Sequence, residues 1–465
     1  MIANMGRIRE KYFGSKEFYL AVLAIALPIA IQNCFTNFVN LLDNVMVGQM
    51  GTLEMSGVSI SNQLLFVCNL CIFGTVSGGG IFCSQFFGAD DYEGVRSSIR
   101  FKLIVGLTII TIAILCFVLA GDKLIYLFLS GEKDLDSVNK TLEFGFSYLK
   151  IMAIGIPGFL MSQVYASTLR EGGETMLPMK AGVTAIITNL VLNYLLIFGH
   201  FGFPKLGVNG AAIATVISRY IEAGIIMYIA HTKEKFKYFK GLYRTLIIPE
   251  ELFRRIFKAA IPLMLNETFW SLAMSTLVQC YSTRGINAVA GYNIANTLNQ
   301  VANSTFMAVG SSIGIIIGKL LGANKCDEAV KTDTKLIVFS IMVGSGAGLI
   351  LVLISPLFPL LYNTSHQARE IATQLIIVQG CFLPLFALRN ASYFTLRSGG
   401  KILITILTDS LFMWLCPVPI AFILSRLTNL SVPVLFMSVQ LSYIFNCIVG
   451  IVLIKKKVWV KNIVK

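Results

Sequence analysis

Apolar residues are grouped along this chain into twelve stretches, each long enough to form a membrane-spanning helix. Crossing the hydrocarbon core of a bilayer takes a helix of roughly 20 apolar residues. The stretches are continuous and lack the alternation of apolar and polar residues that a transmembrane barrel requires. We therefore predict an all-α integral membrane protein with twelve transmembrane helices. The stretches begin near Phe18, Met55, Ile99, Phe144, Met176, Gly207, Arg254, Asn287, Thr334, Ile371, Ile402 and Val434.

The second half of the chain repeats the first half at an offset of 234 residues. Each copy has six stretches, so both copies insert the same way up, related by a pseudo-two-fold axis along the membrane normal. We predict an N-terminal six-helix lobe over residues 1–231, a cytoplasmic inter-lobe loop over 232–249 and a C-terminal six-helix lobe over 250–465. Matching pairs at this offset include Pro28 with Pro262, Gly51 with Gly285, Asn62 with Asn296, and Gly88-Ala89 with Gly322-Ala323.

The composition supports a membrane protein and excludes most soluble classes. Hydrophobic residues make up 55% of the chain and charged residues only 13%, and the mean hydropathy is +0.75. A soluble domain could not cover that much apolar surface. Motifs typical of zinc proteases and P-loop enzymes are missing from the sequence, so we do not expect an enzyme.

The basic residues predict how the chain crosses the membrane. With the N-terminus inside the cell, 28 Lys and Arg residues fall in inner segments and 7 in outer segments. Cytoplasmic segments are enriched in Lys and Arg, so we expect a multi-pass protein of the inner or plasma membrane with both termini cytoplasmic. This topology and contact with anionic lipid explain the net charge of +14, and we expect no nucleic-acid partner.

Ionisable residues inside apolar stretches are costly in hydrocarbon and are therefore candidates for function. Asp43 lies in the first stretch, and its repeat partner is Leu277, so this acid is specific to the N-terminal lobe. Asn189 and Asn193 stand four residues apart and share one helix face, and Thr215 on the next stretch could face them. One carboxylate with carboxamide and hydroxyl oxygens suits a small monovalent cation or a proton held on the acid. The alternatives are that Asp43 caps a helix end at the outer interface and that the asparagines join neighbouring helices.

The C-terminal lobe has its own polar residues within apolar stretches. Glu267 follows Pro262 by five residues and aligns with Asn33, while Arg389 and Asp409 lie in the tenth and eleventh stretches. We expect a substrate-binding or mutually compensating cluster from these residues. A purely structural pair of Arg389 and Asp409 is the alternative, because such pairs also fix helix register. Asn62 and Asn296 are expected either to line the cavity or to join the lobes.

Two prolines predict hinges in the first helix of each lobe. Pro28 and Pro262 each remove a backbone hydrogen bond and permit a bend. We hypothesise that bending at Pro28 couples cation binding at Asp43 to movement of the lobes.

Taken together, these residues resemble the multidrug and toxic compound extrusion (MATE) family. The resemblance rests on Pro28, the run from Asp43 to Gly48, the Gly88-Ala89 pair, and the run from Gly207 to Ala212 that opens the sixth stretch. It implies two six-helix lobes that export organic, often cationic, compounds in exchange for H⁺ or Na⁺. It also implies that Asp43 is the coupling residue and that Asn189, Asn193 and Thr215 complete the cation site. Some family members have an aspartate where this chain has Asn193, so this lobe offers one carboxylate fewer.

We therefore expect a secondary active multidrug exporter that works by alternating access. The alternative is a flippase for lipid-linked precursors, which would need a strongly cationic cavity. The sequence does not decide between H⁺ and Na⁺. We expect no cofactor besides the coupling ion, and no metal site other than a possible sodium site at Asp43, Asn189 and Asn193. We expect small organic substrates and a monomeric protein in a lipid bilayer.

Overall fold

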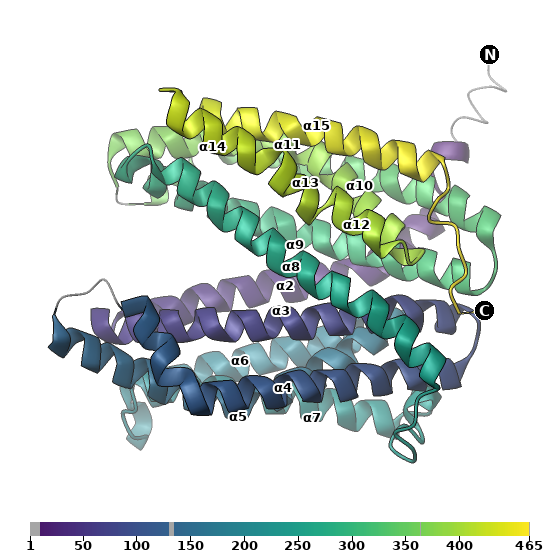
Figure 1. Ribbon diagram of the computed structural model, residues 1–465, viewed down its shortest axis with the longest axis horizontal. Coiled ribbons are helices and arrows are strands. Elements are labelled where there is room, and N and C mark those ends of the chain that lie inside the picture. The colour runs from purple at the N-terminus through teal and green to yellow at the C-terminus, as the bar shows by residue number, and fades with distance from the viewer. Residues whose placement is uncertain (1–9, 130–133, 363, 465) are drawn as a thin grey trace. The chain divides into compact units, whose positions relative to one another are not determined.

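The computed structural model describes residues 10–129, 134–362 and 364–464, and the described residues form helices and no strands (Figure 1). This confirms the predicted all-α fold. The first copy of the repeat forms α2 (Lys16–Gly48), α3 (Thr52–Gly88), α4 (Tyr92–Leu129), α5 (Leu135–Glu171), α6 (Met176–Phe198) and α7 (Val208–Thr232). The second copy forms α8 (Glu250–Ser282), α9 (Ile286–Gly322), α10 (Cys326–Ile354), α11 (His366–Ser398), α12 (Ile402–Thr408), α13 (Ser410–Leu415), α14 (Pro417–Leu427) and α15 (Val432–Lys455). Short 3₁₀ helices cover His200–Gly202, Glu234–Phe239 and Phe358–Leu361.

The sequence repeat is also a repeat of backbone geometry. Helices α8 and α9 begin and end 234 residues after α2 and α3, and α10 begins 234 residues after α4. The turns match as well, because Gly51 and Gly285 both have positive φ, at 150° and 96°. Asp90 and Asn324, another pair at this offset, both adopt left-handed φ values of 54° and 61°. Aspartate and asparagine tolerate this region better than most residues do, so the turn is encoded in both copies.

Eleven helical segments within the described residues are long and apolar enough to cross a membrane. The remaining predicted stretch, the seventh along the chain, corresponds to α8, which has the same length as α2 but carries Glu250, Glu251, Arg254 and Arg255 in its first turns. Helices α3 and α5 have 37 residues each. At 1.5 Å per residue such a helix is about 55 Å long, well beyond a hydrocarbon core of about 30 Å. The ends of these helices therefore extend past the hydrocarbon.

The eleventh predicted span is present but interrupted, since residues 402–427 together are long and apolar enough to cross a membrane. Helices α12, α13 and α14 follow one another with breaks at Asp409 (φ −111°, ψ −93°) and Cys416 (φ −129°, ψ −72°). Pro417 begins α14, and it lacks the N–H that would continue the preceding helix. Broken membrane helices leave backbone groups unpaired, so they persist where other protein groups satisfy them.

The chain forms two compact units, and each contains parts of both copies. Unit 1 comprises residues 1–30, 84–90 and 265–465, and unit 2 comprises residues 31–83 and 91–264. Helix α2 passes from unit 1 to unit 2 after Ala30, and α8 passes from unit 2 to unit 1 after Met264. Each change of unit occurs two residues after a proline, Pro28 in α2 and Pro262 in α8. The predicted lobe boundaries at residues 231 and 250 stay a prediction.

Each unit has its own packing. In unit 2, α5 packs against α4 and α7, and α7 also packs against α6. In unit 1, α11 packs against α9, α10 and α15. One apolar core of unit 1 is built from buried residues of these helices and of α8, α13 and α14, among them Leu375 and Leu435. These helix pairs hold the polar residues of each unit in fixed positions.

Candidate functional site

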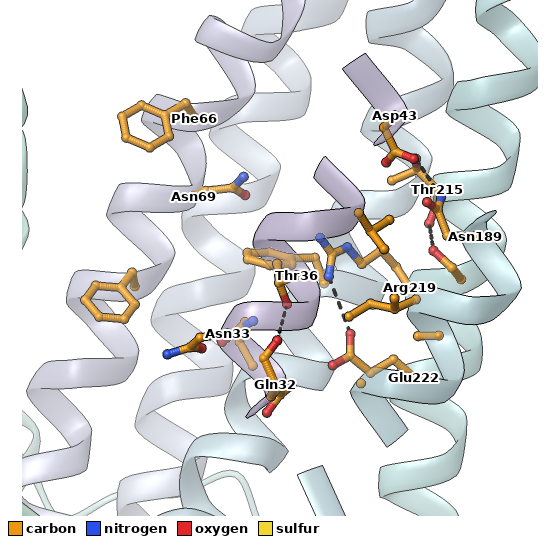
Figure 2. Close-up of a pocket in the computed structure, with 18 of the residues that line it drawn as sticks. Gln32, Asn33, Thr36, Asp43, Phe66, Asn69, Asn189, Thr215, Arg219 and Glu222 are labelled. Atoms are coloured by element: carbon orange, nitrogen blue, oxygen red, sulfur yellow. Dashed lines mark hydrogen bonds and ion pairs between the residues drawn. The ribbon is translucent and has the colours of Figure 1, made fainter. Parts of the chain in front are cut away.

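Unit 2 contains a cavity of about 420 Å³ that is lined by polar and aromatic side chains (Figure 2). Side chains from α2, α3, α5, α6 and α7 form its wall. The cavity falls within the size range of small-molecule sites, which bind apolar surface and orient it with a few polar groups. The lining residues used below are Gln32, Asn33, Asp43, Phe66, Asn69, Phe73, Phe159, Arg170, Asn189, Thr215, Arg219 and Glu222.

Asp43 lines this cavity near the C-terminal end of α2 and is grouped with three of the predicted residues from α6 and α7, of which Asn189 and Thr215 also line the cavity. The Nδ2 of Asn193 donates to Oδ1 of Asp43 at 2.6 Å and lies 3.3 Å from the carboxamide of Asn189. The carboxamide of Asn189 lies 3.2 Å from Oγ1 of Thr215. Asn189 and Asn193 are buried, while Asp43 is half-buried. These four residues form what we call the Asp43 cluster.

The carboxamide of Asn189 completes the Asp43 cluster in one orientation. Its nitrogen then lies 3.2 Å from both carboxylate oxygens of Asp43, and its oxygen accepts from the Thr215 hydroxyl at 3.2 Å. The opposite orientation would turn the amide oxygen toward the carboxylate, and oxygens brought together in this way repel one another unless a proton or a cation lies between them. The carboxylate is therefore satisfied by amide donors in the structure, and its oxygens are also suitable ligands for a small cation.

Two arginines and a glutamate that were not singled out from the sequence also line the cavity. Arg219 and Glu222 lie on α7, one and two turns beyond Thr215, with Nη1 of Arg219 3.5 Å from Oε2 of Glu222. Arg219 also interacts electrostatically with Asp43, and its guanidinium lies 5.1 Å from the ring of Phe159. Arg170, near the end of α5, donates to Oε1 of Gln32 at 2.7 Å. Of the four charged residues that line this cavity, only Asp43 was predicted as a site residue.

A buried ion pair lies near this cavity without lining it. The Nζ of Lys102 on α4 is 2.7 Å from Oε2 of Glu171 on α5, and it also donates to the Ser167 hydroxyl at 3.1 Å. The side chains of Lys102 and Glu171 are 0% and 9% exposed. Several polar partners surround the ammonium, as a buried charge requires. Counting Lys102 as a residue of an inner loop missed this pair, because α4 begins at Tyr92.

The predicted polar residues of the C-terminal half meet in unit 1 at the break of the eleventh span. The Nη2 of Arg389 on α11 is 2.6 Å from Oδ1 of Asp409, and Nδ2 of Asn266 on α8 donates to Oδ2 of Asp409 at 2.9 Å. The guanidinium of Arg389 also lies 4.8 Å from the ring of Tyr443. Glu267 is half-buried and interacts electrostatically with Asp409 and Arg397. A space of about 10 Å³ adjoins Arg389 and Asp409. The substrate-binding and structural interpretations of this cluster both stay predictions.

The remaining predicted residues fall in different places. Asn33 lines the cavity of unit 2 and Asn62 accepts from the Tyr148 hydroxyl at 3.3 Å in the same unit. Asn296 lies half-buried on α9 in unit 1. Pro28 and Pro262 lie inside α2 and α8. The functions predicted for these residues stay predictions.

Comparisons with known proteins agree on one family. A family model described as MatE matches residues 28–195 and 260–423, well over half of the chain. The probable multidrug resistance protein NorM of Thermotoga maritima is 24% identical over 421 residues, covering 89% of this chain and 87% of the relative. The probable multidrug resistance protein YoeA of Bacillus subtilis is 25% identical over 408 residues, covering 87% of both. A solved structure described as the outward-facing conformation of a multidrug resistance MATE family transporter of the MOP superfamily has 19% identity and a TM-score of 0.83, covering 94% of this chain and 95% of that one.

Proposed function

This chain belongs to the MATE family of membrane transporters, and we propose that it is a secondary active exporter of small organic compounds in exchange for H⁺ or Na⁺. Relatives named as multidrug resistance proteins support a broad range of substrates. The resemblance of the sequence to the MATE family implies that these compounds are often cationic. We further propose that the protein is a monomer in the cell membrane with both termini in the cytoplasm, and that it has no cofactor.

The observation that carries this proposal is the Asp43 cluster inside the cavity. A carboxylate within a membrane span is costly unless a partner compensates its charge, so its occupancy by a small cation changes the free energy of the site strongly. Without a coupling ion, Asn193 and the amide of Asn189 donate to the carboxylate. When H⁺ or Na⁺ binds, the Asn189 amide presents its oxygen instead. In this proposal the hydrogen-bonding and charged groups of the Asp43 cluster have partners both when the cation is bound and when it is absent.

Coupling to transport requires that the two arrangements favour different conformations of the protein. Pro28 and Pro262 supply the bending points of the proposed mechanism, because each interrupts the backbone hydrogen bonds of a helix just before that helix changes unit. Asp43 lies on α2, the same helix as Pro28, so a change at the carboxylate acts directly on a helix that can bend.

A flippase for lipid-linked precursors is the alternative from a different class. A site for a lipid diphosphate needs an excess of positive charge near its phosphates. The described lining of the cavity has two arginines and two carboxylates, so it has no such excess. This charge balance supports the exporter over the flippase.

Transport by purified protein in lipid vesicles tests the proposal, with pH and sodium gradients imposed separately. We expect uptake of fluorescent amphiphilic dyes that depends on one of these gradients and that Asp43→Asn abolishes. Asp136→Asn is the matched control, because Asp136 is an exposed acid paired with Lys140 outside the cavity. Dye movement that ignores both gradients, or that survives in Asp43→Asn, contradicts the proposal.

A further inference from the structure

Arg219 lies between two carboxylates of the cavity in unit 2. On α7, Thr215, Arg219 and Glu222 follow one another at spacings of four and three residues, so they share one helix face. Thr215 belongs to the Asp43 cluster, and this face therefore leads from the cluster to Glu222. Figure 2 shows Arg219 drawn between Asp43 and Glu222. The arrangement places one guanidinium near two acids.

The pairing of Arg219 with Glu222 is loose. Their closest nitrogen and oxygen atoms are 3.5 Å apart, whereas charged hydrogen bonds of this kind are usually about 2.7–2.9 Å long. The side chain of Arg219 is 37% exposed, while that of Glu222 is only 6% exposed. The guanidinium also lies 5.1 Å from the ring of Phe159 on α5, a contact that attracts a cation without using its N–H donors. Arg219 is therefore not committed to Glu222.

Both carboxylates keep a positive neighbour if Arg219 moves from one to the other. Arg219 interacts electrostatically with Asp43. Arg170 interacts electrostatically with Glu222, and a hydrogen bond of 2.7 Å to Gln32 holds Arg170 in place. Glu222 therefore retains a cation nearby when Arg219 turns toward Asp43. The four charged residues that line the described cavity, Asp43, Arg170, Arg219 and Glu222, are thus all accounted for in both positions.

Asp43 needs a positive charge whenever it is ionised and no coupling ion is bound. A carboxylate within a membrane span is costly without a compensating charge. The amides of Asn193 and Asn189 donate hydrogen bonds to this carboxylate but supply no charge. A guanidinium supplies both a charge and paired donors. Arg219 is therefore suited to replace the coupling ion at Asp43.

We propose that Arg219 is the internal counter-ion of Asp43, which associates with the carboxylate when the coupling ion leaves and returns to Glu222 when the ion binds. The inference rests on the proposed exporter function and adds a residue that sets the affinity for the coupling ion. Because the ion must displace the guanidinium, Arg219 weakens ion binding. The same competition lets the ion dissociate in each cycle without leaving an isolated charge in the membrane.

The concentration of driving ion that gives half-maximal dye transport in vesicles tests this proposal. Arg219→Gln removes the competing charge, so this concentration should fall about tenfold. Arg219→Lys keeps the charge and should stay within about threefold of the unmodified protein. Lys150→Gln is the control and should change nothing, since it removes a positive charge that contacts Phe146 and does not line the cavity. An unchanged or higher ion requirement in Arg219→Gln overturns the inference.

A double-mutant cycle separates a shared guanidinium from a general effect of charge. Glu222→Gln releases Arg219 toward Asp43 and should raise the ion requirement about threefold, but loss of any nearby negative charge would act in the same direction. If Glu222 acts through Arg219, adding Glu222→Gln to Arg219→Gln should change the ion requirement by less than about twofold. Additive effects of the two substitutions overturn the sharing of Arg219.

These measurements also separate the inference from the function on which it rests. Dye transport that survives in Asp43→Asn contradicts the exporter proposal and the counter-ion together. Transport that is lost in Asp43→Asn, but keeps its usual ion requirement in Arg219→Gln, supports the exporter and removes only the counter-ion. The thermal midpoint of each variant in detergent establishes that it is folded. If Arg219→Gln does not fold, Glu222→Gln alone decides, because an unchanged or lower ion requirement in that variant overturns the inference.

Discussion

The carboxamide of Asn193 donates to the carboxylate of Asp43 at 2.6 Å, joining α6 to α2 inside the cavity of unit 2. This bond stabilises the carboxylate in its charged, vacant form, since the amide nitrogen is a donor only. Asn193→Ala should therefore make the coupling ion bind more tightly. A hydrogen bond to a charged group is worth about 1.5–3 kcal/mol, so the ion concentration at half-maximal transport should fall about tenfold or more.

The measurement is dye transport in vesicles as a function of the driving ion. Thr188→Ala is the control on the same helix, because the Thr188 hydroxyl bonds only to the backbone of Thr184 among the described contacts. A higher ion requirement in Asn193→Ala would show that the amide serves the bound cation rather than the vacant acid.

The buried pair of Lys102 and Glu171 should dominate the stability of the α4–α5 contact. Lys102→Met leaves Glu171 charged, buried and without its main partner, which typically costs about 3–5 kcal/mol. We expect a marked drop in the thermal midpoint of the protein in detergent. Changing both residues to apolar ones should recover much of the loss. Lys140→Met, which breaks the exposed pair with Asp136, should change stability by about 1 kcal/mol or less.

Gly88 and Gly322 lie at a close contact in which an added methyl group has no room. A Cβ at Gly88 would lie 1.9 Å from the carbonyl oxygen of Lys319, and one at Gly322 would lie 1.8 Å from that of Gln85. Backbone cannot move aside as a side chain can, so Gly88→Ala should destabilise the protein by about 1–3 kcal/mol or more. Gly224→Ala is the control, because nothing lies within 4 Å of the added Cβ and the helix gains about 0.5–1 kcal/mol. Thermal unfolding in detergent checks this: the thermal midpoint should fall in Gly88→Ala and rise in Gly224→Ala.

The pair of Arg389 and Asp409 should act on stability rather than on substrate choice. Asp409 accepts from Arg389 and from Asn266, and it stands where α12 and α13 separate. Arg389→Met leaves this carboxylate short of a charged partner and should cost about 3–5 kcal/mol. Protein that remains folded should keep its order of preference among dyes in the vesicle transport assay. A change in that order would instead assign the pair to the substrate site.

Bending of α2 and α8 should limit the rate of transport. Pro28→Ala and Pro262→Ala each restore a backbone hydrogen bond near the residue where a helix changes unit, so both should slow dye transport while leaving membrane insertion intact. Pro157→Ala restores a bond within α5, which lies entirely in unit 2, and should have little effect on the rate. If all three variants transport dye at the same rate, bending at Pro28 and Pro262 is not part of the mechanism.

Sequence reasoning found the helices and the Asp43 cluster because each leaves a regular signal. Long apolar stretches specify spanning helices, and the four-residue spacing of Asn189 and Asn193 places both on one face. Arg170 and Lys102 were missed because they were counted as charges of inner loops, on the assumption of helices about 20 residues long. The actual helices are longer, so these charges lie within them and are buried or half-buried. Glu222 gave no separate signal, because its position in the cavity depends on how α7 packs against α5.

The break at Asp409 was also beyond sequence reasoning. A polar residue in an apolar stretch is compatible with a continuous helix, and α6 carries Asn189 and Asn193 without interruption. What distinguishes Asp409 is the set of partners that reach it from α8 and α11, which are far away in the sequence.

The exchange of helix segments between the two units has a practical consequence for splitting the gene. A cut in the loop 232–249 leaves residues 1–30 of unit 1 on the N-terminal fragment and residues 250–264 of unit 2 on the C-terminal fragment. Neither fragment alone then contains all the residues of a compact unit. The two fragments should accumulate only when they are produced together, so this transporter is suited to complementation assays in which one fragment reports on the presence of the other.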